Sequence, residues 1–107
     1  ESYKDYFELG FESPWMLYQA KVKDPTKFKN ITHVDGTCRI QTVSIDHNPP
    51  YLKLLKEFGK LSGHPVLINT FMNLPGKPIV GTKKQAKIMF DSSQADVLVM
   101  GNEIYTK

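Results

Sequence analysis

The chain has 107 residues, of which 40% are hydrophobic and 11% aromatic, and its formal net charge is +3. These values exclude a disordered chain, and the length predicts a single domain over residues 1–107 without room for two independent cores. No apolar run approaches the ~20 residues of a membrane-spanning helix and no signal pattern opens the chain, so we expect a cytoplasmic protein that does not contact membranes.

The N-terminal part predicts a short helix and then a strand. Apolar residues at positions 3, 6, 7 and 9 suit a helix over residues 3–9, and Glu12-Ser13-Pro14 ends it. The aromatic-rich run over residues 15–22 is typical of a strand.

Residues 37–44 alternate in character, which predicts a second strand. Cys38 and Ile40 fall on one face, and Arg39 and Gln41 fall on the other. The preceding Asp-Gly pair is a strong turn signal, so residues 31–34 and 37–44 are expected to form either a hairpin or a strand, a bend and a strand.

The segment from Asn48 to Gly63 predicts a helix with both ends marked. Asn48 suits the N-cap, Pro49 the first helical position and Gly63 the C-terminal cap. An apolar stripe recurs at helical spacing between them, made of Tyr51, Leu54, Leu55, Phe58 and Leu61.

The C-terminal part predicts further alternation of strands and helices. The apolar run over 65–70 suits a central strand covered on both faces, and the turn over 74–78 follows it. Thr82 has the spacing of a helix N-cap, and residues 95–100 and 103–106 suit a terminal hairpin. The fold class is therefore α/β (α+β), with a mixed twisted sheet and two or three helices.

Two polar clusters are candidates for a binding site, since ligands of such sheets bind beyond the carboxyl ends of strands. The first comprises His33, Asp35, Thr37, Arg39 and Gln41; the second comprises Asn69, Thr70 and Asn73. Short uncharged donors beside a guanidinium suit a phosphate or a carbamoyl group. The alternative for Asn69 and Thr70 is ordinary turn chemistry, in which the side chains bond to local backbone.

Other chemistry has little support in the sequence. His33 and Asp35 stand at a spacing found in some metal sites, but two ligands do not make a site, so no metal is expected in this chain. Cys38, the single cysteine, is expected to be an inert core residue. The lysines form three groups that suit solvated faces, and the third comprises Lys83, Lys84 and Lys87.

Four segments resemble, in order and spacing, the C-terminal part of carbamoyltransferases of the NodU/CmcH type. They are SPWML (13–17), HVDGTCRIQTV (33–43), SGHPVLINTFMNLPGKPIV (62–80) and DVLVMGN (96–102). The resemblance covers nearly the whole chain.

The resemblance implies a piece of a YrdC-like domain that follows a Kae1-like domain in the same polypeptide. Such enzymes use carbamoyl phosphate and ATP as substrates to form carbamoyl-adenylate, and they carbamoylate the hydroxyl of a small-molecule acceptor. Any metal would belong to the Kae1-like domain. The piece alone is expected to be inactive, and nucleic acid is not an expected partner.

The resemblance also implies roles for individual residues. Arg39 would contact the phosphate or adenylate, and Asn69, Thr70 and Asn73 would line the carbamoyl phosphate pocket. Supporting positions would be His33, Asp35, Thr37 and Gln41.

The chain departs from the family pattern at two points. Phe71-Met72 stands where the family has Ser-Phe, and Lys77 stands where it has Glu. The first departure removes a hydroxyl that is expected to touch the ligand. The alternative function is therefore a YrdC-like module that binds nucleotide or RNA without catalysis; a third reading is a degenerate domain that only packs against a catalytic partner.

Overall fold

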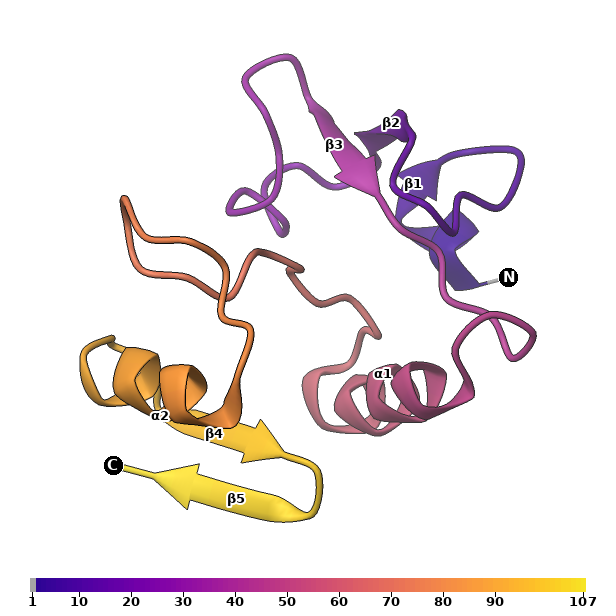
Figure 1. Cartoon of the computed structure of the whole chain (residues 1–107). Coiled ribbons are helices and arrows are strands. Elements are labelled where there is room, and N and C mark those ends of the chain that lie inside the picture. Colours follow the sequence, from indigo (N-terminus) through magenta and orange to yellow (C-terminus); the bar gives the residue numbers. More distant parts are fainter. Residues whose placement is uncertain (1) are drawn as a thin grey trace. The chain divides into compact units, whose positions relative to one another are not determined.

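The computed structural model describes residues 2–107 and divides into two compact units, Glu1–Ile68 and Asn69–Lys107 (Figure 1). The expectation of a single domain stays a prediction. Within residues 2–107, no helix is long and apolar enough to cross a membrane.

The first unit contains a three-stranded antiparallel sheet. A 3₁₀ helix, η1 (Ser2–Asp5), leads into β1 (Phe7–Glu8), which pairs with β2 (Tyr18–Val22), and β2 pairs with β3 (Thr37–Ile40). The order β1-β2-β3 makes β2 the central strand. The predicted strand over 15–22 is thus confirmed for its second half.

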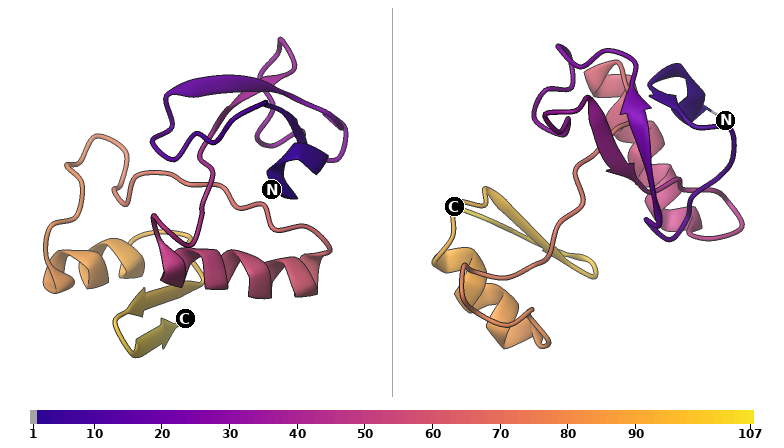
Figure 2. Two further views of the ribbon diagram at one scale, coloured as in Figure 1. Left: turned by 90° about the vertical axis from the view of Figure 1, so that its right-hand side faces the viewer. Right: turned by 90° about the horizontal axis from the view of Figure 1, so that it is seen from above.

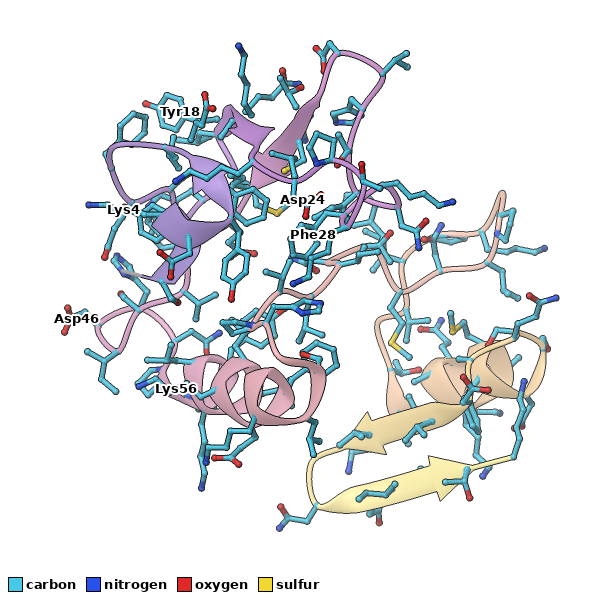
Figure 3. All side chains as sticks on the ribbon, turned by 180° about the vertical axis from the view of Figure 1, so that it is seen from behind. Lys4, Tyr18, Asp24, Phe28, Asp46 and Lys56 are labelled. Carbon is cyan, nitrogen blue, oxygen red and sulfur yellow. The ribbon has the colours of Figure 1, made fainter. Side chains whose placement is uncertain are left out.

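One face of this sheet carries the core of the first unit, which consists of Phe7, Ala20, Val22, Phe28, Cys38 and Ile40. Phe28, labelled in Figure 3, packs the edge of its ring against Tyr6 with the centroids 5.7 Å apart. Aromatic pairs in this geometry are favourable beyond the area that they bury. The predicted strand over 37–44 is confirmed for its first half only, Thr37–Ile40, and there Cys38 and Ile40 are buried while Arg39 is exposed, as the alternation predicts.

The helix α1 (Pro49–Ser62) has the predicted ends. The Asn48 side chain accepts a hydrogen bond from the Tyr51 N–H at 3.2 Å. Gly63 adopts a left-handed conformation with φ +81°, which a residue without Cβ adopts readily, and its N–H donates to the Gly59 carbonyl. No residue of α1 is buried, so the helix owes its boundaries to these caps more than to packing.

The second unit consists of a turn, a helix and a hairpin (Figure 2). The helix α2 (Lys83–Asp91) begins after Thr82, whose side chain accepts from the Gln85 N–H at 3.2 Å. The hairpin joins β4 (Val97–Met100) to β5 (Glu103–Thr106) through Gly101, which has φ +63°.

The core of the second unit is small. Ala86, Phe90 and Leu98 are buried in it, and Met100 and Tyr105 pack against them. The second predicted helix and the terminal hairpin are both confirmed.

Three elements expected from the sequence are wrong: the helix over 3–9, the strand over 31–34 and the strand over 65–70. The predicted helix over 3–9 is instead a 3₁₀ turn, and it gives way to β1 at Phe7. Residues 31–34 form no strand: the His33 N–H donates to the Thr37 carbonyl at 2.7 Å across the Asp-Gly turn, but no strand pairing extends from this bond, and β3 pairs with β2.

Residues 65–70 form no strand either. A central strand needs a partner along its edge, and no strand of residues 2–107 pairs with this segment, within which the two units divide. Ile68 is 65% exposed as a result. The α+β class is confirmed, with two small antiparallel sheets in place of one mixed sheet.

Candidate functional site

The turn before β3 is held by Asp35. Its Oδ1 accepts hydrogen bonds from the Thr37 hydroxyl at 2.6 Å and from the Thr37 N–H at 3.0 Å. Both bonds favour the charged carboxylate and so lower the pKa of Asp35; the bond from the Thr37 hydroxyl has the larger effect, and the bond from the Thr37 N–H has the smaller one. The nearby His33 lowers this pKa further. Gly36, at φ +80°, completes the turn. Asp35 and Thr37 thus set the start of the strand that carries Arg39.

Arg39 lies on the polar face of the sheet. It is opposite Gln19 on β2, and two pairs further along, on the same face, Thr37 is opposite Lys21. Lys21 in turn is opposite Glu8 on β1. The side chains of Arg39 and Lys21 are exposed, and neither forms an ion pair with a carboxylate of the described residues. This face therefore offers a guanidinium and an ammonium on adjacent strands to an anion.

The opposite face explains why Cys38 takes no part. Its thiol is buried in the core and lies 4% exposed, and burial raises its pKa. The expectation that Cys38 is a core residue is thus confirmed, and its inertness stays a prediction, since the thiolate is the reactive form.

The loop after β1 is fastened to the end of β3. The Ser13 N–H donates to the Thr42 Oγ1 at 2.8 Å, the Thr42 N–H donates to the Ser13 carbonyl at 2.9 Å, and the Ser13 hydroxyl donates to the Ile40 carbonyl. Gln41 adds a bond from its Nε2 to the Pro14 carbonyl at 3.0 Å. Gln41 thus links this loop to the polar face that carries Arg39.

In the second unit, Asn73 belongs to a turn. Its Nδ2 donates to the carbonyls of Lys77 at 3.0 Å and Leu74 at 3.2 Å. The Lys77 N–H donates to the Leu74 carbonyl at 3.0 Å, and Gly76 has φ +72°, as a type II turn requires. The amide nitrogen of Asn73 is therefore engaged by local backbone within the turn.

Asn69 and Thr70 are exposed and lie in irregular backbone. The structure thus groups the candidates by unit. His33, Asp35, Thr37, Arg39 and Gln41 follow one strand and its turn in the first unit, and Asn69, Thr70 and Asn73 follow one segment in the second. A joint site made of both groups stays a prediction.

Some residues at the polar face were not foreseen. Gln19 and Lys21 could have been found, since the alternation in residues 18–22 places them on one face. The Ser13–Thr42 pair joins residues 29 apart in the sequence and left no local signal. Met16, which adopts φ +56° in the same loop, left none either.

No group of three or more His, Cys, Asp or Glu side chains within residues 2–107 lies close enough to hold an ion.

Comparison with known proteins places the chain in a family. The model of the family described as "Carbamoyltransferase C-terminus" matches residues 1–107. The chain is 33% identical over 101 residues to a 3'-hydroxymethylcephem-O-carbamoyltransferase of Amycolatopsis lactamdurans, covering 94% of this chain and 19% of that protein. It is 35% identical over 112 residues to the nodulation protein NolNO of Sinorhizobium fredii, covering 100% of this chain and 16% of that protein.

An uncharacterized protein of Synechocystis, sll1178, is 36% identical over 129 residues, covering 100% of this chain and 21% of that protein. The chain therefore spans about a fifth of the length of these curated relatives. The resemblance read from the four segments is confirmed, and the chain belongs to the carbamoyltransferase C-terminus family, a family of transferases.

Proposed function

We propose that this chain is the C-terminal part of an O-carbamoyltransferase that uses carbamoyl phosphate and ATP to form carbamoyl-adenylate. The carbamoyl group then passes to the hydroxyl of a small-molecule acceptor. A Kae1-like domain of the same polypeptide performs that transfer and holds any metal. The piece alone, a part of a YrdC-like domain, does not catalyse.

One observation within the chain carries this proposal: the only arginine, Arg39, lies exposed on a polar sheet face whose geometry is held from both ends. On one side, Asp35 and Thr37 hold the turn that starts β3. On the other side, the Ser13–Thr42 pair and the Gln41–Pro14 bond hold the strand's exit. A guanidinium on a rigid element loses little freedom when it binds a phosphate through two parallel hydrogen bonds.

In the second unit, Asn69, Thr70 and Asn73 are proposed to contribute to the carbamoyl phosphate pocket. Phe71, where the family has Ser, is 74% exposed, so its ring does not pack into a hydrophobic core. Lys77, exposed beside Gly76 in the turn, adds a positive charge where the family has a negative one. Both changes alter the proposed surroundings of the carbamoyl phosphate, but the Arg39 guanidinium is still present to bind it.

The test is an NMR titration of the chain with carbamoyl phosphate, a method that detects binding even at millimolar affinity. We expect shifts of the Arg39 side chain and of the β2 and β3 amides. Because a hydrogen bond to a charged group contributes about 1.5–3 kcal/mol, Arg39→Ala should weaken binding by about tenfold to 150-fold.

Lys29→Ala is the matched control, since it removes one exposed positive charge from the same unit outside the sheet. Sodium chloride at the same ionic strength controls for general screening. If the shifts persist unchanged in Arg39→Ala, or if Lys29→Ala weakens binding equally, Arg39 is not the anchor.

A further inference from the structure

The β4–β5 hairpin has an apolar face that its own unit leaves uncovered. Leu98 and Tyr105 pack on the side of α2, which lies along the hairpin in Figure 1, so the strand alternation turns Val97, Val99 and Ile104 to the other side. Val99 and Ile104 are direct cross-strand partners and are 62% and 69% exposed, and Val97 is 52% exposed. We call Val97, Val99 and Ile104 the open face of the hairpin.

The pattern of β4 is that of a strand covered on both sides. An antiparallel sheet with one solvated face normally alternates apolar residues toward the core with polar residues toward water. The run Val97–Met100 contains no polar residue at all. The fourth residue on the open side is Thr106, opposite Val97, so this side of the hairpin carries no charge. A continuous apolar run of this kind is typical of a strand between two layers.

The second unit has little core with which to stabilise such a hairpin. Among its described side chains only Ala86, Phe90 and Leu98 are buried and apolar. Units of about 40 residues or fewer usually need a disulfide, a metal or association with further protein. The only cysteine, Cys38, lies in the first unit, and no group of three metal-binding side chains lies together in the described part of the chain. Association through the open face is the route that remains.

The length of the relatives indicates what covers this face. The chain spans about a fifth of the curated proteins that it matches, and the matched family is described as a C-terminus, so most of each relative lies outside the matched part. An uncharged apolar face suits a permanent cover, since permanent interfaces are more apolar than transient ones.

We propose that the open face packs against an apolar surface of the polypeptide that precedes this chain. This inference rests on one part of the proposed function, namely that the chain is the C-terminal part of a longer protein. It is independent of the carbamoyl phosphate site on the first unit, because Val97, Val99 and Ile104 all belong to the second.

The test is hydrogen exchange followed by mass spectrometry on peptides that cover residues 97–106, in this chain and in the longer polypeptide. We expect exchange about tenfold slower or more in the longer polypeptide, because a covered face raises the free energy of opening the hairpin. Raising the concentration of the chain alone should not slow this exchange.

A double variant locates the cover on the open face. Val99→Thr with Ile104→Thr keeps β-branched side chains that suit a strand but replaces apolar groups by hydroxyls. In the longer polypeptide it should speed the exchange of residues 97–106 about tenfold or more, since buried methyl groups are lost. In the chain alone it should change little. Val34→Thr is the matched control, because Val34 is fully exposed in the turn before β3 and should alter neither protein.

Equal exchange of residues 97–106 in the two proteins would overturn the proposal, and so would equal effects of the double variant in both. Exchange that slows as the chain alone is concentrated would show that a second copy covers the face instead. Carbamoyl phosphate titration of the same samples separates this inference from the proposed function. Binding through Arg39 with an uncovered hairpin overturns only the inference, whereas a covered hairpin without such binding overturns only the function.

Discussion

Thr42→Val tests whether the bond between Thr42 and Ser13 stabilises the first unit. Thr42 is 7% exposed and Ser13 2% exposed, so water reaches neither side chain well. Valine has nearly the same shape but cannot accept the Ser13 N–H bond that Thr42 Oγ1 accepts at 2.8 Å.

The expected cost follows from that lost acceptor. A buried donor without a partner costs about 1–3 kcal/mol, and the methyl group that replaces the hydroxyl recovers up to about 0.8 kcal/mol. With the full recovery we expect a net loss of about 0.2–2 kcal/mol in the free energy of unfolding, or roughly 1–16 °C in Tm for a unit of this size.

The assay is urea unfolding followed by the fluorescence of Trp15, the only tryptophan, which lies in the fastened loop. Thr26→Val is the matched control, because Thr26 is exposed and its hydroxyl has no hydrogen-bond partner within the described residues. Ser13→Ala should cost less than Thr42→Val, since it removes only the longer bond to the Ile40 carbonyl at 3.3 Å. A Thr42→Val protein as stable as Thr26→Val would refute the reasoning.

Two further outcomes are expected. The pKa of Asp35 is lowered in the folded chain, so the charged Asp35 stabilises the fold fully above the ordinary pKa of 3.8, and this stabilisation is lost as the pH falls through the lower folded pKa. Asp35→Asn should remove this part of the acid dependence of stability, which unfolding curves between pH 5 and pH 2 would measure. Gly63→Ala should destabilise the chain by about 1–2 kcal/mol because φ is +81° there, whereas Gly10→Ala, at ordinary φ and with open space around the new methyl group, should not; equal melting temperatures of the two variants would contradict this.

Features set by neighbours in the sequence could be predicted. Asn48, Pro49 and Gly63 mark the ends of α1 through bonds to residues at most four positions away, and they do so although no residue of α1 is buried. The turn at Gly76 followed from its Pro-Gly pair for the same reason.

Features set by distant partners could not be predicted. Cys38 lies opposite Ala20, and no local pattern shows that β3 pairs with β2 and not with residues 31–34. The apolar run over 65–70 predicts a central strand, but no strand among residues 2–107 pairs with it.

The site shows the same division. Alternation in residues 37–41 was enough to place Arg39 opposite the core face. The engagement of Asn73 could not be known, since an amide at a loop suits a ligand and a backbone carbonyl equally well, and here it bonds to the carbonyls of Leu74 and Lys77.

The buried position of Cys38 has a practical consequence. It is the only thiol in the chain, and from β3 its side chain lies in the core of the first unit. A thiol reagent therefore reaches it only when that unit opens, so the labelling rate measures the opening of one unit without any engineered probe. A ligand that binds the polar face should slow this labelling, whereas a ligand that binds only the second unit, which has no thiol, should leave the labelling rate unchanged.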